Sequence, residues 1–332
     1  MAWLHKFLLR FKAYQQFLDW TKVVILPGFS PLPLYTVATF FFQEIAKDSL
    51  VNKASSLAYS FLLAIFPSII FLFTLIPYIP IDNFQNQLLD LIALVLPQNA
   101  FVAVESTLED IIKNQNGRLL SVGFILALWF ATNGVDTLMK AFNKSSLILE
   151  TRSFLKQRLV AMTLTIMMAF ALIIGLGLIT VSEFVLNFLK DKLIFQDSFW
   201  IQVIALVRWI ILLAIYFVTI SILYRYGPSH SKKWKLFSAG SWLATILAAL
   251  TFWGFAFYIN NFGNYNKLYG SIGTLIVVMI WLYLNSLIIL LGFELNASID
   301  LSKRSIRIVK PRFNSFKSST VDEKLERNKP AV

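Results

Sequence analysis

The sequence has no cysteine, few histidines and little charge, and each shortage excludes a class of protein. Without cysteine the chain forms no disulfide and offers no thiolate for zinc, for an iron–sulfur cluster or for nucleophilic catalysis. Its two histidines, His5 and His230, cannot build a multi-histidine metal site. Charged residues make up 14% of the chain, whereas a soluble domain carries about 25%. The composition therefore excludes an ordinary water-soluble enzyme, and we expect neither a metal nor a cofactor.

Long apolar runs are abundant instead, and 57% of the 332 residues are hydrophobic. A helix needs about 20 mainly apolar residues to cross a hydrocarbon core about 30 Å thick, and lipid offers no water to an open backbone. The sequence therefore predicts an all-α fold, a polytopic membrane bundle of six transmembrane helices. The predicted spans are Ala54–Tyr78, Leu119–Phe142, Val160–Val181, Ile201–Tyr224, Phe237–Ile259 and Ile272–Leu295.

The rest of the chain divides around this bundle. Residues 1–53 predict a cytoplasmic region in which two amphipathic helices, Phe7–Trp20 and Tyr35–Asp48, lie at the membrane interface on either side of a proline-rich break. Residues 54–297 form the six-span domain, whose long first outer loop, Ile81–Arg118, predicts two further short helices. Residues 298–332 form a basic cytoplasmic tail that we expect to be disordered.

The net charge of +12 reflects where lysine and arginine lie, and it needs no nucleic-acid partner. The N-terminal region, the second and fourth connections between spans, and the tail hold 24 of these residues, whereas the other connections hold five. Because cytoplasmic segments are enriched in Lys and Arg, this bias predicts that both termini are cytoplasmic. We expect membrane lipids as partners and no nucleic acid, and nothing in the sequence indicates an oligomeric state.

Several motifs resemble those of the YihY/BrkB family of bacterial inner-membrane proteins. The likeness begins at Lys53–Ser60, which runs into the first span, and is most specific near the C-terminal end. There, Tyr258–Gly273 contains Asn-Phe-Gly-x-Tyr-x-x-x-Tyr-Gly-Ser-x-Gly, and Gly292–Ala297 reads Gly-Phe-Glu-Leu-Asn-Ala. The resemblance extends from Ser49 to Ala297. It implies a multi-pass protein of the bacterial inner membrane that transports a lipid-like or other solute.

Some members of that family carry the label ribonuclease BN, but this chain lacks the residues that such chemistry requires. Metal-dependent RNA cleavage needs histidines and carboxylates clustered around ions. The nearest group of acids is Glu105, Glu109 and Asp110, in the first outer loop, where RNA is absent. We therefore expect no ribonuclease activity and, more generally, a protein that is not an enzyme.

Ionisable residues inside the predicted spans are candidates for function, because charge in a bilayer is costly. Arg208, in the fourth span, either extends to the outer headgroups or binds a phosphate or carboxylate inside the bundle. Asp136, in the second span, either forms an i,i+4 salt bridge with Lys140 or joins Asn133 and Lys140 in a polar stripe that faces a cavity. Glu294, in the sixth span, either holds a helix end or contacts a substrate or a proton.

Amides and tyrosines supply the remaining candidates. Asn285, near the middle of the sixth span, either bonds to a neighbouring helix or lines a transport site. In the last outer loop, Asn261, Tyr265 and Tyr269 lie among glycines that permit tight turns. These three residues either stabilise a structured turn or contact a ligand.

Two functional hypotheses follow from these residues. The first is an inner-membrane transporter or flippase-like protein that moves an amphipathic or anionic molecule through a cavity lined by the second, fourth and sixth spans. Glu294, Asp136 and Arg208 would then be its polar contacts. The alternative is a non-transporting membrane scaffold for envelope assembly, and an enzyme acting on lipid is disfavoured because no nucleophile–base pair has suitable spacing. One shared cavity favours transport, whereas side chains that each reach a headgroup layer favour a scaffold.

Overall fold

The computed structural model describes residues 12–26, 28–29, 32–47, 50–78, 85–86, 89, 106, 109–145, 150–191, 198–229, 235–262 and 271–309. The chain divides into two compact units, Ser49–Phe293 on the one hand and Met1–Asp48 with Glu294–Val332 on the other. Most of the first outer loop, where two short helices are predicted, and the tail beyond residue 309 lie outside the described residues.

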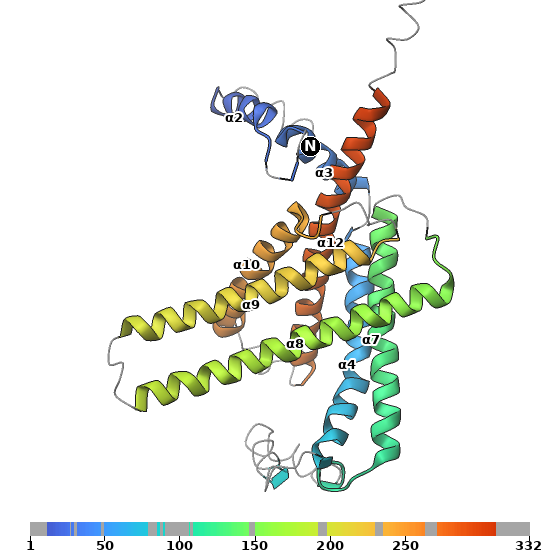
Figure 1. Ribbon diagram of the computed structural model, residues 1–332, viewed down its shortest axis with the longest axis vertical. Coiled ribbons are helices and arrows are strands. Elements are labelled where there is room, and N and C mark those ends of the chain that lie inside the picture. The colour runs from blue at the N-terminus through green and yellow to red at the C-terminus, as the bar shows by residue number, and fades with distance from the viewer. Residues whose placement is uncertain are drawn as a thin grey trace, which may run out of the picture. The chain divides into compact units, whose positions relative to one another are not determined.

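Every regular element in the described residues is helical, which confirms the all-α class (Figure 1). Six helices are long and apolar enough to cross a membrane, as predicted. They are α4 (Leu50–Leu75, followed by the 3-10 helix η1, Ile76–Tyr78), α7 (Gly117–Ser145), α8 (Phe154–Asp191), α9 (Ser198–Tyr226), α10 (Ala239–Phe262) and α12 (Ser271–Val309). The shorter helices α2 (Lys12–Val23) and α3 (Leu34–Lys47) precede them.

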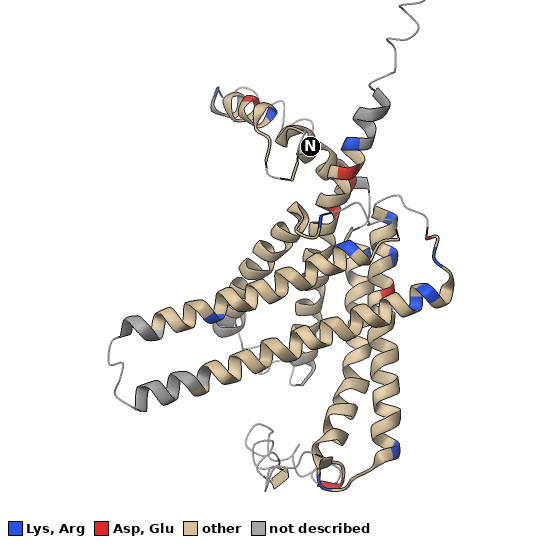
Figure 2. Ribbon diagram, in the orientation of Figure 1, with Lys and Arg blue, Asp and Glu red and all other residues tan. Residues whose placement is uncertain are grey.

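The outer faces of the spans are apolar, the reverse of what a soluble helix shows. On α8, the large side chains of Phe170, Leu172 and Ile174 are exposed. Figure 2 shows long uncharged stretches in the spans, with most charged residues towards the ends of the helices. Such surfaces are stable only against lipid, which agrees with six membrane-spanning helices.

Within the unit Ser49–Phe293, consecutive spans pack as pairs. Helix α4 lies along α7 and α8 lies along α9, while α7 also packs on α8 and α10 on α9 (Figure 1). Small residues permit the close approach of α4 and α7, because a side chain on Gly134 would meet the ring of Phe61 and one on Gly123 would meet the backbone of Phe71. This is the usual way in which membrane helices gain contact where no hydrophobic effect drives them together.

A buried aromatic cluster joins α7, α9 and α12. Phe142 stacks on Phe293 with ring centroids 4.0 Å apart, and Tyr224 meets both rings edge-on at 5.6 Å. The adjacent Gly292 provides the space for this contact. A Cβ at that position would lie 2.6 Å from the carbonyl oxygen of Gly240 and would also clash with the hydroxyl of Tyr224.

In the other unit, α2 and α3 pack against each other as a short hairpin. They correspond to the two predicted amphipathic helices, and the break between them contains Gly28 with a φ of 90°, a backbone conformation that glycine adopts readily. Thr21 is buried, whereas Phe17 and Trp20 stack on each other and are more than half exposed. The interfacial location of these helices stays a prediction.

Candidate functional site

A polar junction connects α7 to α8 and consists of Asn133, Asp136, Lys140, Gln157 and Arg158. Asp136 Oδ2 lies 2.7 Å from Lys140 Nζ, and Asp136 Oδ1 accepts a hydrogen bond of 2.6 Å from Gln157 Nε2. The side chain of Lys140 is 67% exposed and that of Asp136 is 15% exposed. An ion pair with an exposed partner contributes little by itself, so the bond to Gln157 is what connects the carboxylate to the next helix.

Arg158 provides the second connection of the polar junction. Its Nη1 donates to Asn133 Oδ1 at 2.5 Å, and its Nη2 donates to the carbonyl oxygen of Trp129 at 3.4 Å. The guanidinium also lies 4.2 Å from the centroid of the Trp129 ring, an attractive cation–π arrangement. The stripe of Asn133, Asp136 and Lys140 therefore faces α8, and it contains the i,i+4 salt bridge that the spacing predicts.

A second polar group ties the connection between α7 and α8 to the end of α9. Arg152 Nε lies 2.8 Å from Glu150 Oε1, and Arg152 Nη2 donates to the carbonyl oxygen of Gly227 at 2.7 Å. Asn143 donates to Glu150 Oε2 at 2.7 Å and accepts from the backbone N–H of Ser229 at 2.9 Å. Burial by itself raises the pKa of Glu150. The hydrogen bonds and charge of Arg152, with the bond from Asn143, together lower it by more than burial raises it, so the pKa lies below its ordinary value.

The lowered pKa of Glu150 predicts an acid-sensitive contribution to stability. The contribution is complete above the ordinary pKa of 4.5 and is lost as the pH falls through the lower, folded-state value. Between about pH 5 and about pH 3, the melting temperature of the wild type should therefore fall more steeply than that of Glu150→Gln. Glu109→Gln is the control, because Glu109 is half exposed and pairs with Lys113 on its own helix. Equal slopes for Glu150→Gln and the wild type would contradict the assignment.

The three intramembrane charges have different surroundings. Arg208 Nη1 donates to Ser182 Oγ of α8 at 3.4 Å, whereas Asp136 bonds within the polar junction. Within the unit Ser49–Phe293, the structure thus gives Arg208 and Asp136 different partners. Glu294 belongs to the other unit and is buried in α12, on the same helical face as the buried Ser298.

The remaining predicted residues are amides and loop tyrosines. Asn285 Nδ2 donates to the carbonyl oxygen of Trp281 at 2.8 Å, one turn earlier in its own helix. Asn261 lies in the last turn of α10, but its side chain is outside the described part of the chain. Tyr265 and Tyr269 also lie outside the described residues, so their proposed ligand contacts stay predictions.

Helix α9 carries three buried hydroxyl groups, those of Tyr216, Ser221 and Tyr224, and α12 carries a fourth, that of Ser286; together they are here called the hydroxyl seam. Tyr224 Oη donates to the carbonyl oxygen of Ile289 at 2.7 Å and so connects the two helices. The hydroxyls of Tyr216, Ser221 and Ser286 are buried and have no hydrogen-bond partner among the described residues. A buried polar group left without a partner costs about 1–3 kcal/mol.

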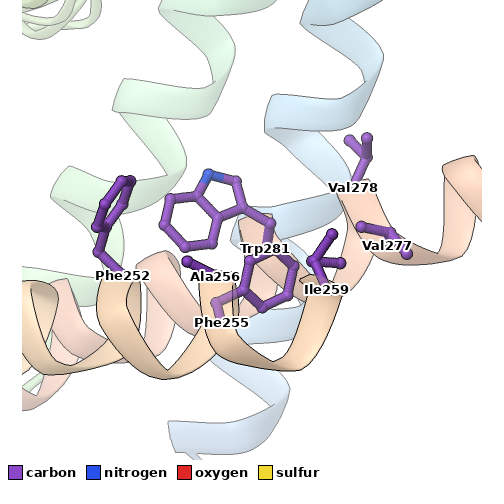
Figure 3. Close-up of a pocket in the computed structure, with 7 residues that line it drawn as sticks. All are labelled: Phe252, Phe255, Ala256, Ile259, Val277, Val278 and Trp281. Carbon is purple, nitrogen blue, oxygen red and sulfur yellow. The ribbon is translucent and has the colours of Figure 1, made fainter. Parts of the chain in front are cut away.

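Apolar crevices lie on two sides of α10. One of about 470 Å³ lies between α10 and α12 and is lined by aromatic and aliphatic side chains, among them Phe252, Phe255 and Trp281 (Figure 3). Another, of about 430 Å³, lies between α9 and α10 and includes Phe217 and Trp242. Asp136, Arg208 and Glu294 line neither crevice.

The polar junction and the hydroxyl seam include residues that sequence reasoning missed. Arg158 lies two residues before the predicted start of the third span, so it counted as a loop charge. Its bond to Asn133 joins residues 25 apart in the chain, and no local pattern reveals such a bond. Tyr216, Ser221 and Ser286 lie in apolar runs where hydroxyls usually bond to their own helix, as Thr219 does with Ile215.

Comparison with known proteins agrees with this membrane architecture. The ribonuclease-like protein YfkH of Bacillus subtilis (strain 168) is 35% identical over 253 residues, which cover 76% of this chain and 91% of YfkH. The UPF0761 membrane protein Smlt0865 of Stenotrophomonas maltophilia (strain K279a) is 29% identical over 261 residues, and a UPF0761 membrane protein of Xanthomonas campestris pv. campestris (strain B100) is 25% identical over 265 residues. The chain spans 60% of the length of each of these two relatives. No solved structure matches the chain.

The family assignment rests on most of the sequence. The region that matches the sequence pattern of one protein family is residues 41–312, and it includes α4 through α12 and all six helices that are long enough to cross a membrane. It also includes the motifs that suggested the resemblance, from Lys53 to Ala297. The chain is an integral membrane protein that belongs to the Virulence factor BrkB family.

Proposed function

We propose that the protein moves an amphipathic or anionic, lipid-like molecule across the bacterial inner membrane. The hydroxyl seam carries this proposal, because Tyr216, Ser221 and Ser286 keep polar atoms inside the bundle without a partner among the described residues. A helix bundle that only fills a bilayer gains nothing from such groups, each of which costs about 1–3 kcal/mol. The polar part of a passing molecule, with its water, would supply the missing hydrogen bonds.

The apolar crevices suit the other part of such a molecule. Helix α9 contributes Tyr216 and Ser221 to the hydroxyl seam and Phe217 to the crevice between α9 and α10. The hydroxyl seam therefore offers hydrogen bonds to a headgroup, and the crevice offers apolar surface to an acyl chain. Sites for small molecules commonly combine mostly apolar walls with a few placed polar groups.

The orientation and the polar contacts form part of the proposal. Both termini would be cytoplasmic, because the segments on that side hold 24 Lys and Arg residues against five on the other. Asp136 and Arg208 would contact the polar part of the cargo, with Asn133 and Asn285 as further candidates, and Glu294 is a separate candidate in its own unit. Ionisable residues within spans commonly mark substrate or ion pathways.

We also propose that the protein carries out no bond chemistry. Its relative YfkH is named as ribonuclease-like, and an RNA-cleaving metal site needs clustered ligands. Within the described residues, no group of three His, Asp or Glu side chains could hold a metal ion. Transport requires no such site, and purified protein should leave labelled RNA intact in the presence of Mg²⁺ or Mn²⁺.

Reconstitution of the full chain in liposomes with fluorescent phospholipids and labelled small anions tests transport. Tyr216→Phe removes one hydroxyl and keeps the ring, so flux should fall about three- to tenfold, as expected for one lost hydrogen bond. Its thermal stability should stay equal or rise, because an unpartnered buried group is removed. Glu294→Gln should also slow flux if the carboxylate contacts the cargo. Thr163→Val is the control, because its exposed hydroxyl bonds to the carbonyl oxygen of Leu159 in its own helix.

Two results would contradict the proposal. Folded wild-type protein that moves none of these lipids or anions faster than protein-free liposomes is not a transporter of this class. Normal flux in Tyr216→Phe together with higher stability would show that the hydroxyl seam serves packing alone.

A scaffold for envelope assembly is the second candidate, and one observation favours it. Helix α2 exposes Phe17, Trp20 and Val23 on one side although it packs on α3 with another. Exposed aromatic and aliphatic side chains at helical spacing suit the headgroup boundary of a bilayer. A deletion of residues 12–26 that abolishes membrane organisation but leaves liposome flux intact would favour the scaffold.

A further inference from the structure

Arg158 is a half-buried cation without an acidic partner in the described part of the chain. Its hydrogen bonds go to two neutral groups, Asn133 Oδ1 and the carbonyl oxygen of Trp129. The carboxylate of the polar junction, Asp136, already pairs with Lys140 at 2.7 Å. The polar junction therefore holds one positive charge that its own residues do not neutralise.

The position of Arg158 along the two helices places its charge beside the middle of α7. It is the fifth residue of α8, but its partners Trp129 and Asn133 lie about 18 and 24 Å from the start of α7, at a rise of 1.5 Å per residue. Helix α8 thus begins beside the middle of α7. The guanidinium lies next to the membrane-spanning part of α7, where an unpaired charge is costly.

The groups around this charge suit an oxyanion. Arginine offers five N–H donors in a planar fork that matches phosphate geometry, and the bonds described here use two of them. The Trp129 ring covers one face of the guanidinium. Because Trp129 is itself 55% exposed, a ligand can reach the ring and the guanidinium from outside α7 and α8. Lys140 is largely exposed and adds a flexible cation to the same junction.

We propose that Arg158, with Trp129 as an apolar wall, binds the phosphate of an anionic phospholipid. The charged headgroup neutralises the guanidinium, and the acyl chains stay in contact with the apolar outer surface of α7 and α8. This inference rests on the proposed function for the role of that lipid as cargo, and it names the cargo as an anionic phospholipid. The binding site itself does not depend on transport.

Binding is tested by titrating the purified full chain in detergent with short-chain phosphatidylglycerol, phosphatidylcholine and inorganic phosphate. Arg158→Gln should raise the Kd for phosphatidylglycerol about tenfold, which corresponds to about 1.4 kcal/mol, and leave phosphatidylcholine binding unchanged. Lys156→Gln is the matched control: it removes the same charge from an exposed position two residues earlier in α8, and the Kd should change less than about twofold. Arg158→Lys keeps the charge but loses the fork, so its Kd should lie between those of the wild type and Arg158→Gln, and it substitutes if Arg158→Gln does not fold.

Three outcomes overturn this inference. An unchanged Kd for phosphatidylglycerol in Arg158→Gln, or in Arg158→Lys if Arg158→Gln does not fold, would show that Arg158 does not bind the lipid. An equal loss of affinity in Lys156→Gln would show that the lipid is held by diffuse electrostatic attraction and not by a site at Arg158. Inorganic phosphate that competes with the lipid at similar concentration shows a site for a free anion. A wild type that binds phosphatidylglycerol through Arg158 but moves no lipid overturns the proposed function instead. Flux without any Arg158-dependent binding overturns only the inference.

Discussion

Replacement of Gly292 by leucine is expected to prevent folding of the membrane bundle, and replacement by alanine to destabilise it by about 1–3 kcal/mol. Even the single Cβ of alanine would lie 2.6 Å from the carbonyl oxygen of Gly240 and 2.7 Å from Cβ of Ala244, and would clash with the Tyr224 hydroxyl. A backbone carbonyl cannot rotate away as a flexible side chain can. The helices α9, α10 and α12 would therefore have to separate.

Thermal unfolding in detergent and elution as a single species on size exclusion measure this effect. The alanine variant should melt several degrees lower, since about 1 kcal/mol shifts the melting temperature by about 2–4 °C in a domain of this size. Gly177→Ala and Gly254→Ala are matched controls in other spans, because a Cβ at either position meets nothing within 4 Å. They should be neutral or slightly stabilising, as alanine favours helix over glycine. A Gly292→Ala protein as stable as these controls would show that the close contact is not required.

Phe142→Ala should have the second largest effect, a loss of about 2–4 kcal/mol. In soluble proteins a buried Phe→Ala change lowers the free energy of unfolding by about 3–5 kcal/mol, and part of this loss is the free energy of transferring the ring out of water. In a bilayer that part is small because lipid is as apolar as the protein interior, so the loss comes from the cavity and the missing contacts. Phe142 is fully buried and stacks on Phe293 at 4.0 Å, so both losses are complete here.

The control for this prediction is the same substitution on a lipid-facing surface. Phe170 is 61% exposed on α8, and lipid chains would fill the space that its ring leaves. Phe170→Ala should therefore change the free energy of unfolding by less than about 0.5 kcal/mol, as surface substitutions usually do. Equal losses for Phe142→Ala and Phe170→Ala, measured by unfolding in the same detergent, would contradict the packed cluster.

Hydropathy was sufficient to predict the fold class and the six spans, because only helices satisfy their own backbone in lipid. It was less informative about where helices end. The third span was predicted as Val160–Val181, whereas α8 extends from Phe154 to Asp191. A helix continues past the apolar run when polar residues such as Lys156 and Gln157 still favour helix, and hydropathy does not register that continuation.

The candidate site was predictable only where it depends on local spacing. Asp136 and Lys140 stand four residues apart, and their salt bridge forms as the spacing indicates. The partners from α8 could not be predicted, because Gln157 and Arg158 meet α7 through the geometry of the crossing helices. The family motif points to Gly292 but not to its contact with Gly240, which depends on how closely two distant spans approach.

The bonds around Asn143 and Arg152 have a consequence for how the bundle opens. The last turn of α9 is held by Arg152, whose partner Glu150 also binds Asn143 at the end of α7. The last turn of α9 cannot fray without releasing the segment that joins the pair α4–α7 to the pair α8–α9. These four helices should therefore behave as one cooperative foldon, with similar hydrogen-exchange protection for the backbone amides near Phe142 and Tyr224.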